Sequence, residues 1–307
     1  MKKVKSLLPI YLILSLVILI STVVVSLTAG INLGIDFVGG KQIEVKVPEG
    51  NSTETYYNKI NGVLDDYGLT INTSFTEDKY TDTYYVVKIN TREISTEKAL
   101  EIRQKLATEL GVNEENVSEI LSISGNVKQK TVLNIGLAVL GIFAILFVAS
   151  WVRYGIMEGL GMLFGAIHNM IISFAAIVLT RIELTVSTCA AIAVISILFV
   201  AIFASILERA REKLLMKQNK EMSTREIYLD CHKKSLFVTT IVLSGVVVFA
   251  IASLFVPSTI IKLFALSSIV CAVVAFYSTF VSTYLTGYLA EAKSIRTREK
   301  LSKNKIN

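Results

Sequence analysis

Apolar residues along this chain are gathered into long stretches that no charged residue interrupts. A helix rises about 1.5 Å per residue, so about 20 apolar residues cross the roughly 30 Å hydrocarbon core of a bilayer. The pattern therefore predicts six transmembrane helices. They fall within residues 6–35, 131–152, 159–180, 184–207, 235–261 and 263–290.

The chain between the first two apolar stretches has a different pattern, with short alternating segments separated by turns. It predicts strands over 42–47, 70–75, 84–89 and 117–124, and helices over 53–67 and from Ser95 to Gly111. This βαββαβ order is typical of a ferredoxin-like sheet covered by two helices. We therefore predict a polytopic α-helical membrane protein with a small α+β domain after the first transmembrane helix.

Lys and Arg residues are concentrated in segments that lie on one side of the membrane if all six stretches cross it. These segments are the N-terminus, the link at Arg153, the loop 208–234 and the tail 291–307, whereas the opposite short links hold only Arg181 and Lys262. Such a bias places both termini in the cytoplasm. The net charge of +6 is explained by this topology, so we expect membrane lipids and no nucleic acid as partners.

The predicted organisation has four parts in the cell membrane. Residues 1–30 form the cytoplasmic N-terminus and first helix, 31–130 the extracytoplasmic domain, 131–290 the remaining helices, and 291–307 the cytoplasmic tail. Lys2, Lys3 and Lys5 before the first apolar stretch also resemble the start of a signal peptide. The stretch is too long for one and five more follow, so we predict a retained helix.

Candidate catalytic chemistry is sparse. The predicted external domain contains neither His nor Cys and no carboxylates paired at a mechanistic spacing, and the three Cys of the chain show no metal-binding spacing. We therefore predict a binding or gripping module without metal or cofactor, rather than an enzyme such as a hydrolase.

A glycine-rich segment follows the first apolar stretch. It reads Gly34-Ile35-Asp36-Phe37-Val38-Gly39-Gly40. Glycine supplies positive φ angles where the chain must turn from a helix into a strand, and an Asp side chain can accept hydrogen bonds from nearby backbone N–H groups. Taken alone, the segment predicts a turn at the membrane surface.

Together with other segments in the same order, this turn resembles the signature of SecF, a subunit of the bacterial SecD/SecF protein-export complex. The likeness covers nearly the whole chain, including its six spans and its one large external loop. The further matching segments are Arg153, Gly161 and His168; Leu184-Thr185-Val186; Glu208-Arg209-Ala210-Arg211-Glu212; Lys234-Ser235-Leu236 with Thr239-Thr240; and Tyr277-Ser278.

The resemblance implies an accessory role in the Sec pathway, assisting protein export across the cytoplasmic membrane with the proton gradient. It implies a SecD-like subunit, the SecYEG translocon and the translocating polypeptide as partners. Two alternatives stay open. One is a small-molecule or lipid exporter of the same resistance-nodulation-division superfamily, which would need its own intramembrane carboxylate. The other is a scaffold subunit that conducts nothing.

The chain departs from the family pattern at intramembrane positions. Asn169 stands where relatives have Asp, Ala201 and Ile202 stand where they have an Asn-Asp pair, and Lys234 replaces an Arg. Neither an amide nor an aliphatic side chain can carry a proton, so proton conduction by this subunit is left open. His168 fits either a proton relay or a helix-packing role, and Lys234 is expected to snorkel to the membrane surface.

Overall fold

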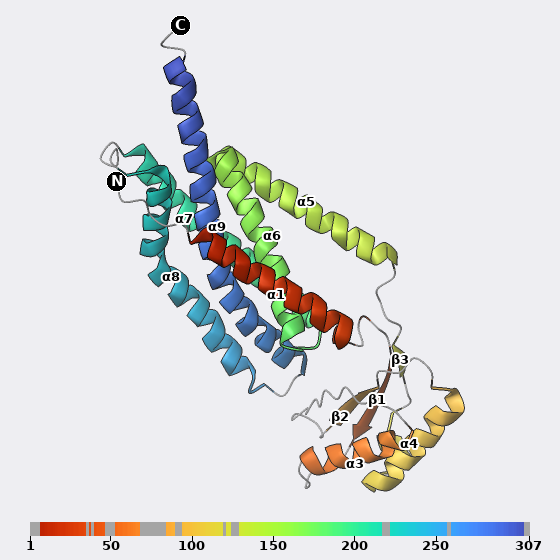
Figure 1. Cartoon of the computed structure of the whole chain (residues 1–307). Helices are drawn as coiled ribbons and strands as arrows, with labels where there is room; N and C mark the ends of the chain where they lie inside the picture. The colour runs from red at the N-terminus through yellow and green to blue at the C-terminus, as the bar shows by residue number, and fades with distance from the viewer. Residues whose placement is uncertain are drawn as a thin grey trace.

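The computed structural model of the chain describes residues 7–34, 37, 40–46, 53–67, 84–89, 94–118, 121–123, 129–216, 222–256 and 259–303. Its main feature is a bundle of six long helices with a small α+β unit beside one end of the bundle (Figure 1). The bundle helices are α1 (Leu8–Thr28), α5 (Gln129–Tyr154), α6 (Ile156–Leu179), α7 (Val186–Leu215), α8 (Thr224–Ser253) and α9 (Thr259–Lys303).

All six bundle helices are long and apolar enough to cross a membrane, which confirms the prediction of six membrane helices. α6 is the most enclosed, with more than half of its span buried, whereas α1 and α5 expose most of their apolar side chains. The last helix, α9, packs against α8, α6 and α7 and extends well past the apolar stretch predicted from the sequence (Figure 1). It is therefore the central element of the bundle.

Local sequence explains where the bundle helices begin. A capping box precedes α8, in which the Ser223 side chain accepts from the Glu226 N–H and the Glu226 side chain accepts from the Ser223 N–H. Thr185 caps α7 by accepting from the Thr188 N–H. Between α5 and α6 the whole connection is Gly155, whose φ of 123° few other residues adopt. These local features define where the helices begin, keep the α5–α6 connection short and allow α6 to run antiparallel to α5.

The small unit contains a three-stranded antiparallel sheet with the order β2-β1-β3. Its strands are β1 (Gly40–Lys46), β2 (Tyr84–Ile89) and β3 (Leu121–Ile123), and its helices are α3 (Thr53–Asp65) and α4 (Thr96–Leu110). β1 is central and pairs Lys41 with Ile89 on one side and with Ser122 on the other. A separate hydrophobic core joins the sheet to the helices, including Val45, Ile60, Leu64, Leu106 and Val117.

The predicted ferredoxin-like βαββαβ domain requires correction. Among the described residues the sheet has three strands, the range 70–75 predicted as a strand lies outside them, and the chain is predominantly helical. Where a strand was predicted over 117–124, Val117 makes only an isolated bridge to Val45 and β3 has three residues. Such segments have local β propensity, but a strand forms only where a neighbour completes its hydrogen bonds. The fold class is a six-helix membrane bundle with a small three-stranded sheet and two helices.

Candidate functional site

Four polar side chains from three helices meet inside the bundle. The Ser15 Oγ of α1 lies 2.8 Å from the His168 Nε2 of α6 and 2.7 Å from the Tyr277 Oη of α9. The other ring nitrogen, His168 Nδ1, lies 3.1 Å from the Ser278 Oγ of α9. Tyr277 also donates to the Tyr11 carbonyl at 2.5 Å. We name Ser15, His168, Tyr277 and Ser278 the polar node.

The polar node lies at membrane depth. His168 is about halfway along α6, which runs from Ile156 to Leu179, so ~18 Å of helix separates it from the Ile156 end. Its side chain is buried, as are those of Ser15 and Ser278. Polar groups at such depth need partners within the protein because lipid offers none. The node therefore ties α1, α6 and α9 together.

The hydrogen bonds of the node fit a neutral imidazole. Each serine hydroxyl can donate or accept, so Ser15 and Ser278 can serve the two ring nitrogens of a neutral His168. Among the described residues, the hydrogen-bond partners of the node are hydroxyls and a backbone carbonyl, with no carboxylate to balance a charge. A proton on His168 would therefore carry an uncompensated charge at depth.

Small residues allow α6 and α9 to approach closely beside the node. A Cβ added at Gly161 would collide with the Thr286 side chain, and one added at Gly165 would collide with the Ser282 side chain. Gly161 and Gly165 are four residues apart and so lie on the same face of α6, as in other membrane helix pairs with small residues at this spacing. Gly161, one of the residues that carry the family resemblance, thus occupies a helix-packing position.

Asn169 lies next to the node on α6 and is fully buried, but it contacts a different helix. Its Nδ2 donates to the Ser196 Oγ of α7 at 3.1 Å. Its Oδ1 has no hydrogen-bond partner among the described residues. The structure therefore places Asn169 beside His168 without joining the two in one hydrogen-bond network.

Lys234 is far along the chain from the node and belongs to a separate ionic cluster near the start of α8. Its Nζ lies 3.2 Å from Asp230 Oδ2, and Lys213 of α7 pairs with the same carboxylate. The Lys234 side chain is 62% exposed, and its extension toward the membrane surface stays a prediction. Arg153 and Glu208 form a further pair at 2.7 Å that joins α5 to α7.

A cavity occurs at the positions where the resemblance expects an Asn-Asp pair. It has a volume of about 200 Å³ and lies between α7 and α8, with Ala201, Ile202, Arg209 and Ser235 in its lining. The Ser235 Oγ is buried and has no partner among the described residues. At these positions the chain thus has the aliphatic side chains of Ala201 and Ile202 beside a cavity, and no carboxylate.

The glycine-rich turn is described in part. Gly34 is buried, and an added Cβ would lie 2.7 Å from Thr185 Cγ2 and 2.9 Å from Glu183 Oε1. Phe37 packs against the hydrophobic core of the bundle, and Gly40 begins β1. Ile35, Asp36 and Gly39 lie outside the described residues. The start of the turn at Gly34 therefore packs closely against the α6–α7 connection.

Sequence reasoning missed a second buried histidine, His232 of α8. Its side chain is 3% exposed, its Nδ1 lies 3.2 Å from Thr283 Oγ1, and its ring meets Phe280 edge-on at 4.5 Å. The apolar stretch was taken to begin after Lys233 and Lys234, which left His232 in a loop. The helical spacing of buried residues at 228, 232, 235 and 239 could have revealed it.

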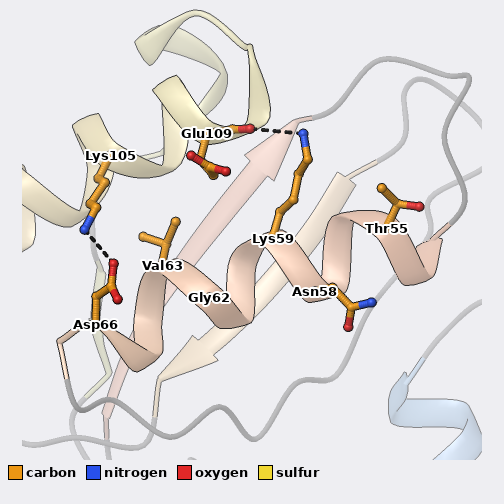
Figure 2. Close-up of a pocket in the computed structure, with 8 residues that line it drawn as sticks. All are labelled: Thr55, Asn58, Lys59, Gly62, Val63, Asp66, Lys105 and Glu109. Carbon is orange, nitrogen blue, oxygen red and sulfur yellow. Dashed lines mark hydrogen bonds and ion pairs between the residues drawn. The ribbon is translucent and has the colours of Figure 1, made fainter.

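The small α+β unit carries an open groove between α3 and α4, with a volume of about 550 Å³ (Figure 2). Two contacts cross it: Lys105 Nζ pairs with Asp66 at 2.7 Å, and Lys59 Nζ donates to the Glu109 carbonyl at 3.3 Å. The hydrogen bond that Lys105 donates to the Asp66 carboxylate raises the pKa of Lys105. The floor between these contacts is formed by Gly62 and Val63 (Figure 2). The lining thus combines both charges with a small apolar floor.

Comparison with known proteins gives a consistent result. Residues 103–292 match the family model described as protein export membrane protein SecD/SecF, C-terminal, and residues 24–47 match the SecD/SecF GG motif. No curated protein matches the sequence.

Two solved structures share the fold. A crystal structure of SecDF in a super-membrane-facing form is 19% identical with a TM-score of 0.66, and covers 99% of this chain and 40% of its own. A crystal structure of SecDF, a translocon-associated membrane protein from Thermus thermophilus, is 21% identical with a TM-score of 0.68, and covers 94% of this chain and 38% of its own. The chain thus spans about two-fifths of the length of these structures. Because the family match covers more than half of its residues, this chain belongs to the SecD/SecF family of protein export membrane proteins.

Proposed function

We propose that this chain is a SecF-like accessory subunit that assists protein export across the cytoplasmic membrane, working with a SecD-like partner at the SecYEG translocon. The observation that carries the proposal is the combination of a six-helix bundle with the family match over residues 103–292. The chain spans 40% of the length of one SecDF structure. The proposal requires a second multi-pass membrane subunit as the partner.

The charge distribution supports the proposed orientation. The ionic cluster of Lys213, Asp230 and Lys234 and the pair of Arg153 and Glu208 gather at one end of the bundle. An excess of Lys and Arg favours the cytoplasmic side. The unit formed by β1–β3, α3 and α4 then faces the outside, where it meets an emerging polypeptide. Its groove suits a polypeptide, which carries both charges and apolar side chains, better than a lipid chain.

We assign the proton chemistry of export to the partner and a geometric role to this subunit. Among the described bundle residues, Glu158, Glu208, Glu212, Asp230 and Glu291 all lie near the ends of their helices that carry the basic clusters. The polar node at depth holds hydroxyls and an imidazole without a carboxylate. This arrangement supports a subunit that maintains the membrane geometry of the complex while the partner supplies the acidic group.

Deletion of the chain tests the export role. Pulse-chase labelling of a secreted precursor should show slower removal of its signal peptide in the deletion strain, and the intact chain should restore the rate. The tagged chain should also co-purify with a second multi-pass membrane subunit. Unchanged export together with increased accumulation of a drug or lipid would instead favour an exporter, the alternative within the same superfamily.

A further inference from the structure

The segment that follows α1 is fastened to the connection between α6 and α7. Two backbone hydrogen bonds run in opposite directions, from Gly34 N to the Leu184 carbonyl at 2.9 Å and from Leu184 N to the Asn32 carbonyl at 2.8 Å. They form a parallel bridge between Leu33 and Leu184. The Asn32 Nδ2 adds a bond to the Arg181 carbonyl at 2.9 Å. We name residues 29–34 and 181–185 the junction.

Arg181 closes the junction from the other side. Its Nη1 donates to the Gly30 carbonyl at 2.5 Å and its Nη2 donates to the Ala29 carbonyl at 3.3 Å. Ala29 is the C-cap of α1 and Gly30 follows it, at the helix end where backbone oxygens lack helical partners and attract cations. Arg181 adopts a φ of 57°, a conformation that residues other than glycine rarely adopt. Arg181 therefore keeps an unfavourable backbone conformation in the α6–α7 connection, while its side chain caps the C-terminal end of α1.

Close packing leaves the junction little freedom. A Cβ at Gly34 would meet Thr185 Cγ2 at 2.7 Å and the Leu184 carbonyl at 3.1 Å. Beyond Gly34, the Phe37 N–H donates to the Gly34 carbonyl at 2.9 Å, and the Phe37 side chain packs on the bundle core. The chain thus leaves the bundle as a tightly held segment.

The junction stands between two elements that matter for export. On one side is α6, which carries His168 of the polar node and ends at Leu179. On the other side is β1, the central strand of the external sheet, which begins at Gly40. Gly34 and Gly40 are six positions apart in the sequence, so a displacement of the outer end of α6 would reach β1 through a short length of chain. Coupling of this kind requires contacts that move as one body.

We propose that the junction is a rigid joint that transmits movement of α6 to the external domain, and that Arg181 is its positioning residue. The proposal deepens the proposed export function and rests on it. The joint works only while the α6–α7 connection and the segment 29–34 move together. Loss of the Arg181 guanidinium leaves the Leu33–Leu184 bridge as the main connection, so export slows although both parts remain folded.

Two substitutions of Arg181 distinguish the contribution of its guanidinium group from that of its backbone conformation. Arg181→Gly keeps and eases the left-handed backbone but removes both bonds to α1, whereas Arg181→Lys keeps a cation with a single ammonium donor. In the full chain held in lipid nanodiscs, hydrogen exchange over 29–34 and 181–185 should quicken roughly tenfold in Arg181→Gly, because charge-assisted bonds are lost. Arg181→Lys should fall between that variant and the unchanged chain.

The same variants are then tested in cells for export of a precursor. Arg181→Gly should slow export while the amount of assembled complex is unchanged, and Arg181→Lys should restore part of the rate. Gly34→Ala should also slow export, since its added Cβ would collide with Thr185 and push the two segments of the junction apart. Gly141→Ala is the matched control, because nothing lies within 4 Å of a Cβ there. Full export by Arg181→Gly with quickened exchange would overturn the proposal.

A reversible lock distinguishes a rigid joint from a moving hinge. Leu33→Cys with Leu184→Cys places two thiols on bridge partners, whose spacing of about 4.8 Å between paired backbones suits a disulfide. Oxidation should restore export to Arg181→Gly, and reduction should remove the effect. Loss of export on oxidation in the chain with Arg181 intact would show that the junction must open, which contradicts the proposal.

The exchange measurement keeps this inference separate from the proposed function. If the deletion strain exports normally, the export role fails, and with it the transmission role of the junction. Exchange that quickens in Arg181→Gly then still shows that the guanidinium holds the junction. Unchanged exchange overturns Arg181 as its positioning residue, whatever the export assay shows.

Discussion

Hydrogen bonding and titration at His168 can be separated by substitution. Gln can donate and accept between Ser15 and Ser278 but cannot be protonated, whereas Ala does neither. We expect His168→Gln to keep export and thermal stability close to the unchanged chain. His168→Ala should lower stability by about 1 kcal/mol, because interhelical hydrogen bonds in membranes contribute on this order. Thermal unfolding of the purified chain and pulse-chase export measure the two effects.

The contrary outcome at His168 is equally informative. Loss of export in His168→Gln, with the complex assembled and the chain stable, would assign a relay role to the imidazole. Retained export that an ionophore still blocks would place the proton site in the partner, as proposed.

Glycine at 165 sets the distance between α6 and α9. Gly165→Ala should destabilise the bundle by about 1–3 kcal/mol, since the added methyl group overpacks a tight contact. The methyl group would collide with the Ser282 side chain, so Ser282→Gly in the same chain should recover part of the loss. Thermal unfolding provides the measurement, with Gly141→Ala as the control in open space. Equal stability of Gly165→Ala and Gly141→Ala would contradict the packing role.

Some residue roles were accessible from the sequence and others were not. The order of the family segments pointed to His168, and its spacing from Gly161 placed both on α6. Arg181 looked like a minor topological charge, because the sequence does not show that α1 ends against the α6–α7 connection. Lys233 and Lys234 indicate a membrane boundary in the sequence. They do not show that the adjacent His232 side chain is buried inside the bundle. Contacts between distant segments decided these cases.

Among the elements, the helices were predicted more closely than the sheet. Membrane helices satisfy their own backbone hydrogen bonds, so composition and length within one segment suffice to predict them. A strand depends on its neighbours: the segments 42–47 and 84–89 largely coincide with β1 and β2, whereas only three residues of 117–124 form β3.

The groove between α3 and α4 offers a test at the scale of one element. Gly62→Ala should stabilise the small α+β unit by about 0.5–1 kcal/mol, since glycine is unfavourable within a helix, and nothing lies within 4 Å of the added Cβ. Gly62→Trp instead fills the floor of the groove. If the groove holds the emerging polypeptide, the Trp variant exports more slowly while the Ala variant does not.

Stability and export must be measured on the same Gly62 variants. Thermal unfolding establishes that the Trp variant is folded before its export rate is compared. Normal export by a folded Trp variant would remove the groove from the proposed polypeptide contact and leave the rest of the domain as its surface.

At the scale of the whole molecule, the export proposal depends on which side of the membrane each part faces. The bundle gathers its ionic clusters at one end, and the small sheet lies beside the other end (Figure 1). Gln104→Cys on α4 should therefore react with a membrane-impermeant maleimide added to intact cells, and Met222→Cys before α8 should react only after the membrane is permeabilised. Both positions are exposed, so access depends on the membrane alone. A background with Cys189→Ala removes the exposed native thiol. The reverse labelling pattern would invert the molecule and place the sheet in the cytoplasm, where it could not reach a polypeptide that has already crossed.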